Sequence, residues 1–371
     1  MAKSALRIGL DLEQGAIAAA EIHSGKQEQI LTGAHVRGLP EGLLFEGEVV
    51  EPDALAVELK SFWKEAGFKS KRVELGIANQ KIVVRTMQFP QIDEKELRAA
   101  VEFHAQEHIP IPIDEAILDF KVLWTYTDEN GSVQQRILLV AAQRDMVGRF
   151  LDVAHKAGLA VSGIDLQAFA LIRALAPRPS FIDEGAPAAD APSVEVAALV
   201  NIGSGVTNLA ITANGIPQFT RVINLGSEAL DQALVTHRAI ARDEADMLRV
   251  MIGLRGEQPD EPGELTAETV DEVHQVLEQA CEAFSDELRR SIDYYHTQED
   301  AGEIAKIVLS GDGSLTRNIV YYLAESLHLP VEVGNPLRRV GENKTKLSEA
   351  ELEMLAPRLG IAIGLALEDE G

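Results

Sequence analysis

The chain has 371 residues, with 34 lysines and arginines against 59 aspartates and glutamates, giving a formal net charge of −25. Such an acidic surface repels the phosphates of nucleic acids and anionic lipids, so we expect neither nucleic-acid binding nor direct membrane insertion. The single cysteine, Cys281, makes neither an internal disulfide nor a thiolate metal cluster. No apolar run approaches the roughly 20 residues that span a bilayer. We therefore expect a protein of a reducing compartment, which something else must bring to a membrane if it works there.

The N-terminal half alternates predicted strands and helices. Residues 6–12 and 17–22 are expected to form a hairpin around a short polar turn. Asn130-Gly131 is a strong signal for a second hairpin. The remaining predicted strands cover 72–78, 82–89, 120–127, 133–142 and 160–164, and the predicted helices cover 54–66, 93–108, 145–156 and 166–175.

The C-terminal half follows a segment rich in proline, alanine and acidic residues, 177–193, which we expect to be an exposed linker. An acidic loop is expected at 253–264. The predicted strands cover 196–201, 206–212, 218–222, 304–309 and 331–333, and the predicted helices cover 228–236, 243–252, 267–298 and a final segment ending at Leu367.

Both halves open in the same way. At an offset of 190 residues (201 − 11), the turn from Asp11 to Gly15 aligns with the turn from Asn201 to Gly205. A tight glycine-containing turn lets backbone N–H groups approach phosphate oxygens, and an aspartate at the strand end holds Mg²⁺ through water. Two such hairpins resemble the actin/hexokinase ATPase superfamily. The resemblance implies an α/β, actin-like ATPase fold with two duplicated RNase H-like halves.

Within that superfamily the chain resembles the PilM family of FtsA-like type IV pilus assembly proteins. The matching segments keep their order through most of the sequence. They include 39–49, 84–90, His108 to Pro112 with Asp114-Glu115 and Leu118-Asp119, 287–295, Asn335-Pro336-Leu337 and 360–367. The resemblance implies an FtsA-type 1C insert in the first half. The implied domains are 1–33 with 152–192 (1A-like), 34–151 (1C-like), 193–240 with 302–371 (2A-like) and 241–301 (helical, 2B-like).

The resemblance also implies a nucleotide cleft, but this chain departs from the family there. The candidate residues are Gly9, Asp11, Glu13, Gln14, Gly15, Asn201, Gly203, Ser204, Gly205, Thr207, Asp246, Arg249, Gly311 and Gly313. Glu13 stands where the family has glycine and would point a carboxylate at the phosphates. Asn201 replaces an aspartate that organises Mg²⁺ and the attacking water. We therefore expect ATP with Mg²⁺ to bind weakly or not at all, and assign no catalytic residue.

A cytoplasmic scaffold or adaptor is the function that the resemblance implies. The family takes the N-terminal cytoplasmic peptide of PilN, a bitopic inner-membrane protein, in a groove between the insert and the first half. Our candidate groove residues are Arg85, Met87, Asp165 and Phe169. Arg85 and Met87 share a strand face by period two. The pilus assembly motor ATPase is a second candidate partner.

Two other functions stay open from the sequence alone: an active actin-like ATPase, and a polymerising protein like FtsA or MreB. The sequence also leaves open which assembly the protein belongs to: a type IV pilus, a competence pseudopilus or a relative of a secretion system. His104, Glu107 and His108 match a zinc-peptidase pattern, but it abuts Ile109-Pro110, where the helix should end. We interpret it as a solvated helix end and assign no metal site.

Overall fold

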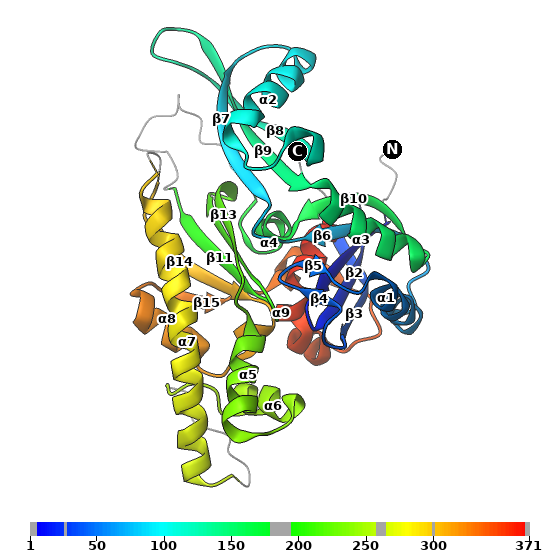
Figure 1. The fold of residues 1–371 in the computed structure, drawn as a ribbon, viewed down its shortest axis with the longest axis vertical. Helices are drawn as coiled ribbons and strands as arrows, with labels where there is room; N and C mark the ends of the chain where they lie inside the picture. The colour runs from blue at the N-terminus through cyan, green and yellow to red at the C-terminus, as the bar shows by residue number, and fades with distance from the viewer. Residues whose placement is uncertain (1–5, 26–27, 179–193, 257–264, 299–300, 368–371) are drawn as a thin grey trace.

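The computed structural model describes residues 6–25, 28–178, 194–256, 265–298 and 301–367 (Figure 1). The expected linker at 177–193 and the loop at 253–264 lie largely outside the described residues. In the described part of the chain, no helix is both long and apolar enough to cross a membrane.

A six-stranded mixed sheet forms the core of the first half, in the order β10-β6-β1-β2-β3-β16. Its strands are β1 (Leu6–Glu13), β2 (Ala16–Ser24), β3 (Gln29–Gly38), β6 (Arg72–Ile77), β10 (Ala160–Leu166) and β16 (Glu342–Asn343). Only Leu31 of β3 is fully buried. Because β3 lacks the alternation of buried and exposed residues, the sequence did not predict it.

Helices cover both faces of this sheet. On one face, α1 (Pro52–Ala66) and α3 (Arg144–Lys156) share a core with Ile8, Leu10 and Leu12 of β1. On the other face, α9 (Glu349–Ala366) packs on Ala18, Ala20 and Ile22 of β2. Burial from both sides explains why β2 is an almost continuous apolar run, whereas β1 alternates and meets α9 through Gly9.

A five-stranded sheet forms the core of the second half, in the order β13-β12-β11-β14-β15. Its strands are β11 (Val196–Ile202), β12 (Thr207–Ala213), β13 (Ile216–Ile223), β14 (Ile304–Ser310) and β15 (Val331–Val333). Around it lie α5 (Ser227–Arg238), α6 (Arg242–Met251), α7 (Ala267–His296) and α8 (Ile319–Leu327). One stripe of α7 is buried at helical spacing, and the fully buried Cys281 belongs to it, which makes this thiol a core residue.

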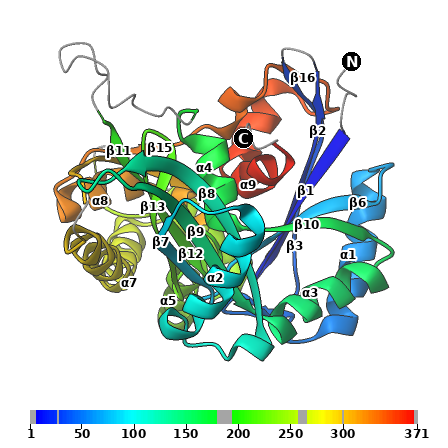
Figure 2. The ribbon, with the colours of Figure 1, turned by 90° about the horizontal axis from the view of Figure 1, so that it is seen from above.

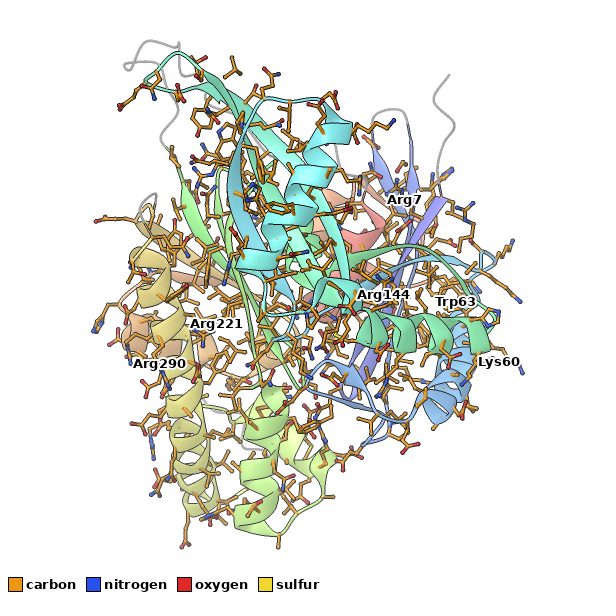
Figure 3. The ribbon with its side chains drawn as sticks, turned by 45° about the horizontal axis from the view of Figure 1, so that its top comes forward. Arg7, Lys60, Trp63, Arg144, Arg221 and Arg290 are labelled. Carbon is orange, nitrogen blue, oxygen red and sulfur yellow. The ribbon has the colours of Figure 1, made fainter. Side chains whose placement is uncertain are left out.

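A separate three-stranded sheet stands beside the first half, in the order β7-β9-β8. It consists of β7 (Val83–Pro90), β8 (Ala116–Thr127) and β9 (Val133–Gln143), with α2 (Glu94–His108) on one face. Arg144, at the start of α3, donates from Nη2 to the carbonyl oxygen of Ala116 at 2.8 Å and so ties this sheet to α3 (Figure 3).

Short elements complete the described chain. They are the two-residue strands β4 (Leu44–Phe45) and β5 (Glu48–Val49), and the 3₁₀ turns η1 (Ile113–Glu115), η2 (Asp312–Leu315) and η3 (Pro336–Arg339).

Strand pairing corrects two of the domain boundaries expected from the sequence. The expected insert, 34–151, contains β6, yet β6 pairs with β1 and β10 of the first sheet. The separate sheet covers only Val83–Gln143. The expected second half, 302–371, contains β16 and α9, which join β3 and the first sheet. Neither boundary carries a local signal, because β6 precedes the separate sheet and because β16 and α9 return to the first sheet only late in the chain.

The helices α4 (Gln167–Leu175) and α9 lie side by side between the two large sheets (Figure 2). They cross at Gly364, where any side-chain carbon would clash with the carbonyl oxygen of Ala170. Arg173 of α4 reinforces the crossing, donating from Nε to the carbonyl oxygen of Gly364 at 2.8 Å. The close crossing lets one helix pair bury apolar surface against both halves.

We predict that Gly364→Ala lowers the free energy of unfolding by about 1–3 kcal/mol, because the added methyl group forces the two helices apart. The matched control is Gly148→Ala on α3, where the added carbon meets open space. That control should gain about 0.5–1 kcal/mol, as a helical glycine replaced by alanine does. Urea unfolding measures both; a Gly364→Ala variant as stable as the wild type would contradict the close crossing.

Candidate nucleotide cleft and partner groove

The two glycine-containing turns predicted to hold phosphate meet across the interface between the halves. The first turn joins β1 to β2, and the second joins β11 to β12. A side-chain carbon on Gly15 of the first turn would lie 2.9 Å from Ser204 Oγ of the second. The two turns are therefore in direct contact.

Glu13 of the first turn aims its carboxylate into the second turn. Its Oε1 accepts a hydrogen bond from Asn201 Nδ2 at 3.3 Å, and its carboxylate also accepts one from the backbone N–H of Ser204. A carbon added to Gly203 would lie 2.7 Å from Glu13 Oε2. The carboxylate thus takes the donors that a phosphate oxygen would use in such a turn.

Gln14 fills the neighbouring position. Its side chain lies against Gly205, its Nε2 donates to the Glu228 carboxylate of α5, and its Oε1 accepts from the backbone N–H of Glu46 at 3.2 Å. Arg242 of α6 lies beside this contact. Its Nη1 is 2.8 Å from carboxylate oxygens of both Glu41 and Glu228.

Asp11 is buried behind Glu13. Its Oδ1 accepts from Gln167 Nε2 at 2.6 Å, and Gln167 Oε1 accepts in turn from Asn208 Nδ2 at 2.8 Å. These two hydrogen bonds link β1, α4 and β12. The sequence analysis missed Gln167 and Asn208. Both are polar residues in otherwise apolar segments, and a buried amide must find hydrogen-bond partners. This pattern could have marked them as members of a buried polar network.

Asp11 and Glu13 are buried neighbours whose negative charges would repel each other, so we expect the two carboxyls to share one proton. Burial, followed by repulsion from the Glu13 charge, raises the pKa of Asp11 well above its usual value. Burial also raises the pKa of Glu13 to about 7. The Ser204 N–H and Asn201 stabilise charge on Glu13, so we assign the shared proton to Asp11.

Asp246 and Arg249, two of the predicted nucleotide residues, are engaged within the protein. Arg249 is fully buried and pairs with Asp246, with Asp231 Oδ1 at 2.6 Å from Nε, and with Asp312 Oδ2 at 2.7 Å from Nη2. Burial alone would raise the pKa of Asp312, but Arg249 and Arg358 hold it below its usual value. Arg249 therefore joins α5, α6 and η2 to one another.

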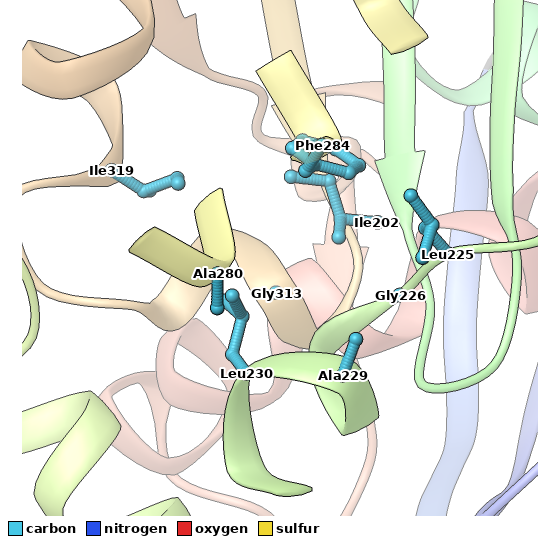
Figure 4. Close-up of a pocket in the computed structure, with 9 residues that line it drawn as sticks. All are labelled: Ile202, Leu225, Gly226, Ala229, Leu230, Ala280, Phe284, Gly313 and Ile319. Atoms are coloured by element: carbon cyan, nitrogen blue, oxygen red, sulfur yellow. The ribbon is translucent and has the colours of Figure 1, made fainter. Parts of the chain in front are cut away.

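The loop with Gly311 and Gly313, also predicted to bind nucleotide, packs on β11. Carbons added to Gly311 or Gly313 would clash with Ile202. Around Gly313 lies an apolar cavity of about 20 Å³, roomy enough for about one water molecule (Figure 4). Its other lining residues are Leu225, Gly226, Ala229, Leu230, Ala280, Phe284 and Ile319.

The last two predicted nucleotide residues make structural contacts. Gly9 lies under α9, where a side-chain carbon would clash with the carbonyl oxygen of Ala362, and Thr207 Oγ1 donates to the carbonyl oxygen of Leu225 at 2.7 Å. In the described residues, the side chains of Glu13 and Gln14 occupy the contact between the two turns, and the apolar cavity beside Gly313 measures about 20 Å³.

A much larger cavity, about 850 Å³, opens between the three-stranded sheet and the two halves. We call it the partner groove. Its wall from the three-stranded sheet includes Ile117, Asp119, Lys121, Leu138 and Val140. The first half contributes Asp165, Phe169 and Arg173 among others, and the second half contributes Gly215, Ile216 and Pro217.

Of the four predicted groove residues, Asp165 and Phe169 line this cavity. Arg85 and Met87 do not. They share a face of β7, as period two requires, but their cross-strand partners Leu139 and Ile137 belong to the core under α2. The neighbouring residues of β7 face the groove instead: Thr86, for example, pairs with Leu138, which lines the groove. The apolar run of β9 was the missed signal, since it indicates a strand covered on both faces.

The zinc-peptidase pattern falls at the end of α2. The exposed His104 lies edge-on to the rings of Phe89 and Phe103, 5.5 Å from each centroid. Among the described residues, no group of three or more histidines, cysteines or carboxylates is arranged to hold a metal ion.

Comparisons with known proteins agree with this architecture. A family model described as type IV pilus assembly protein PilM matches residues 9–370. A chain of a solved PilM-PilN type IV pilus biogenesis complex is 26% identical over 97% of both chains, with a TM-score of 0.79. The ethanolamine utilization protein EutJ from Carboxydothermus hydrogenoformans is 13% identical, covering 98% of this chain and 89% of its own, with a TM-score of 0.52. MreB5 of Spiroplasma citri bound to ADP is 15% identical, covering 96% and 94%, with a TM-score of 0.51. The last two likenesses concern the fold alone, and the predicted actin-like ATPase fold is confirmed.

We predict that Glu13→Gln changes how the free energy of unfolding depends on pH. Because the pKa of Glu13 is raised from 4.5 to about 7, this carboxyl makes a contribution to the free energy of unfolding of the wild type. The contribution is fully present below pH 4.5 and is lost as the pH rises through about 7. The variant should therefore gain stability relative to the wild type between about pH 5 and about pH 8. Denaturant unfolding across this range measures the difference. Glu102→Gln, at an exposed position of α2, is the control. If stability depended on pH in the same way in Glu13→Gln and in the wild type, the raised pKa of Glu13 would be refuted.

Proposed function

Since the chain belongs to the PilM family of type IV pilus assembly proteins, we propose that it is an adaptor of an inner-membrane pilus assembly complex or a related machine. It binds the N-terminal cytoplasmic peptide of a PilN-like membrane protein. The observation that carries this proposal is the partner groove, which is about 850 Å³ in volume and open at the surface. The similar PilM chain was solved in a complex with PilN.

The partner groove suits an extended peptide. Three edge strands contribute to its walls: β8 of the three-stranded sheet, β10 of the first sheet, and β13 of the second sheet through its first residues. A peptide can add to such an edge through backbone hydrogen bonds, with alternate side chains entering the groove. Apolar side chains such as Ile117, Leu138 and Phe169 offer the contact area that orders the peptide.

The charge of the chain favours the same partner class. A net charge of −25 attracts basic segments of the kind that precede a membrane span on its cytoplasmic side. Recruitment through such a partner places the protein on the cytoplasmic face of the inner membrane. The pilus assembly motor ATPase is a further candidate partner in this proposal.

The proposal includes weakened or lost nucleotide binding. Three features support it: Glu13 and Gln14 fill the contact between the two turns, Arg249 is saturated by carboxylates, and only about 20 Å³ is open beside Gly313. An adaptor does not need turnover, so the fold here serves as a frame for protein contacts.

We expect Ile117→Asp to weaken the binding of a PilN-like N-terminal peptide by at least about tenfold, because it puts a charge on the apolar groove face. Ile117 is 37% exposed, so the change should not disturb folding. The matched control is Val57→Asp on α1, also exposed and away from the groove. Fluorescence anisotropy with a labelled peptide reports both. Equal affinities for the two variants, with Phe169→Ala also unchanged, would rule out this groove.

A titration with a fluorescent ATP analogue and Mg²⁺ should show no saturable binding up to about millimolar nucleotide. Saturable binding that weakens on Asp11→Ala would instead support the alternative function of an active ATPase. Light scattering with added nucleotide would then test for polymerisation.

A further inference from the structure

We propose that Glu13 and Gln14 form an internal latch, in which the Glu13 carboxylate occupies the anion-binding position of the second turn and holds the two halves closed without a bound ligand. In the described residues, the closed arrangement is thus built from the chain's own side chains at the place where related folds hold a phosphate. This inference concerns the conformation of the chain and does not depend on its partner.

The first observation is the donor set around Glu13. The Ser204 N–H and Asn201 Nδ2 both belong to the second half, and both donate to this one carboxylate of the first half. Both hydrogen bonds favour the ionised form of Glu13, whereas its burial favours the protonated form and raises its pKa to about 7. Separating the halves would leave the carboxylate and both donors without these partners, so the contact favours closure.

The second observation is that the glycines of the second turn make room for side chains of the first turn. Gly203 and Gly205 match the phosphate-binding turn of the family, yet here their missing side chains admit Glu13 and Gln14. A carbon on Gly203 would come within 2.7 Å of Glu13 Oε2. The geometry that lets a backbone approach phosphate equally lets it approach a carboxylate.

The third observation is that the latch extends beyond one contact. Gln14 accepts from the Glu46 N–H in the first half and donates to Glu228 in the second. Arg242 of the second half joins Glu41 of the first half to Glu228. Separate side chains from both halves therefore converge on the same closed geometry.

Closure also affects the partner groove, because Phe169 from the first half and Pro217 from the second both line it. If the groove takes the peptide proposed above, the latch forms the binding site before any nucleotide is present. This effect on the groove rests on the proposed function, whereas the latch itself does not.

The test is the distance between the halves, measured by pulsed electron spin resonance. Spin labels go on Lys60→Cys in α1 and Glu244→Cys in α6, which are exposed positions, while the native Cys281 is fully buried. We expect one narrow distance distribution without nucleotide, unchanged by millimolar Mg-ATP. Adding Glu13→Gly should broaden it and lengthen its mean by more than about 2 Å, the scale of domain rearrangements.

Gln14→Ala should give a smaller broadening, and it serves as the readout if Glu13→Gly does not fold. Glu102→Gln in the same labelled background should leave the distribution unchanged. The latch is overturned if both cleft variants keep the narrow distribution, or if the unmodified chain is broad and narrows only with Mg-ATP. Loss of peptide affinity at Ile117→Asp is measured separately, so failure of the groove and failure of the latch are distinguishable.

Discussion

The contact between the two turns is the constraint on which the cleft depends. Asp11, Glu13 and Asn201 lie within a few residues of the points where β1 and β11 end, and the two sheets bring these strand ends face to face. A carboxylate placed there needs donors, because a buried charge without partners costs several kcal/mol. The second turn supplies them, and the proton shared with Asp11 removes one of two charges that would otherwise repel.

Away from the turns, apolar packing joins the halves. The helices α4 and α9 supply the shared core, and the crossing at Gly364 keeps them close enough to bury apolar surface against both sheets. Polar contacts at the cleft and apolar contacts at the helix pair therefore lie at separate parts of the interface. The three-stranded sheet projects beyond both, and its unpaired edge at β8 faces the partner groove. A frame held in this way offers a protein-binding surface whose walls come from three parts of the chain.

The sequence predicted much of the fold because its signals are local. Alternating or continuous apolar runs marked β1, β2 and β11, and one buried stripe marked α7. It did not predict β3, which has no periodicity of its own, or the two-residue β16. It predicted β6 as a strand but placed it in the insert, because only pairing with β1 and β10 shows which sheet it joins. At the groove, period two showed that Arg85 and Met87 share a face, but only pairing with β9 decided which face.

By itself, the sequence determined the two opening hairpins, the presence of Glu13 and Asn201 at their turns, and the class of fold that these turns resemble. The tertiary structure alone decided where the Glu13 carboxylate lies, which buried carboxylates saturate Arg249, and that Gln167 links Asp11 to Asn208. The physical reason is the separation along the chain. Asp11 and Gln167 are 156 residues apart, and no local pattern records contacts that arise only when two sheets pack together.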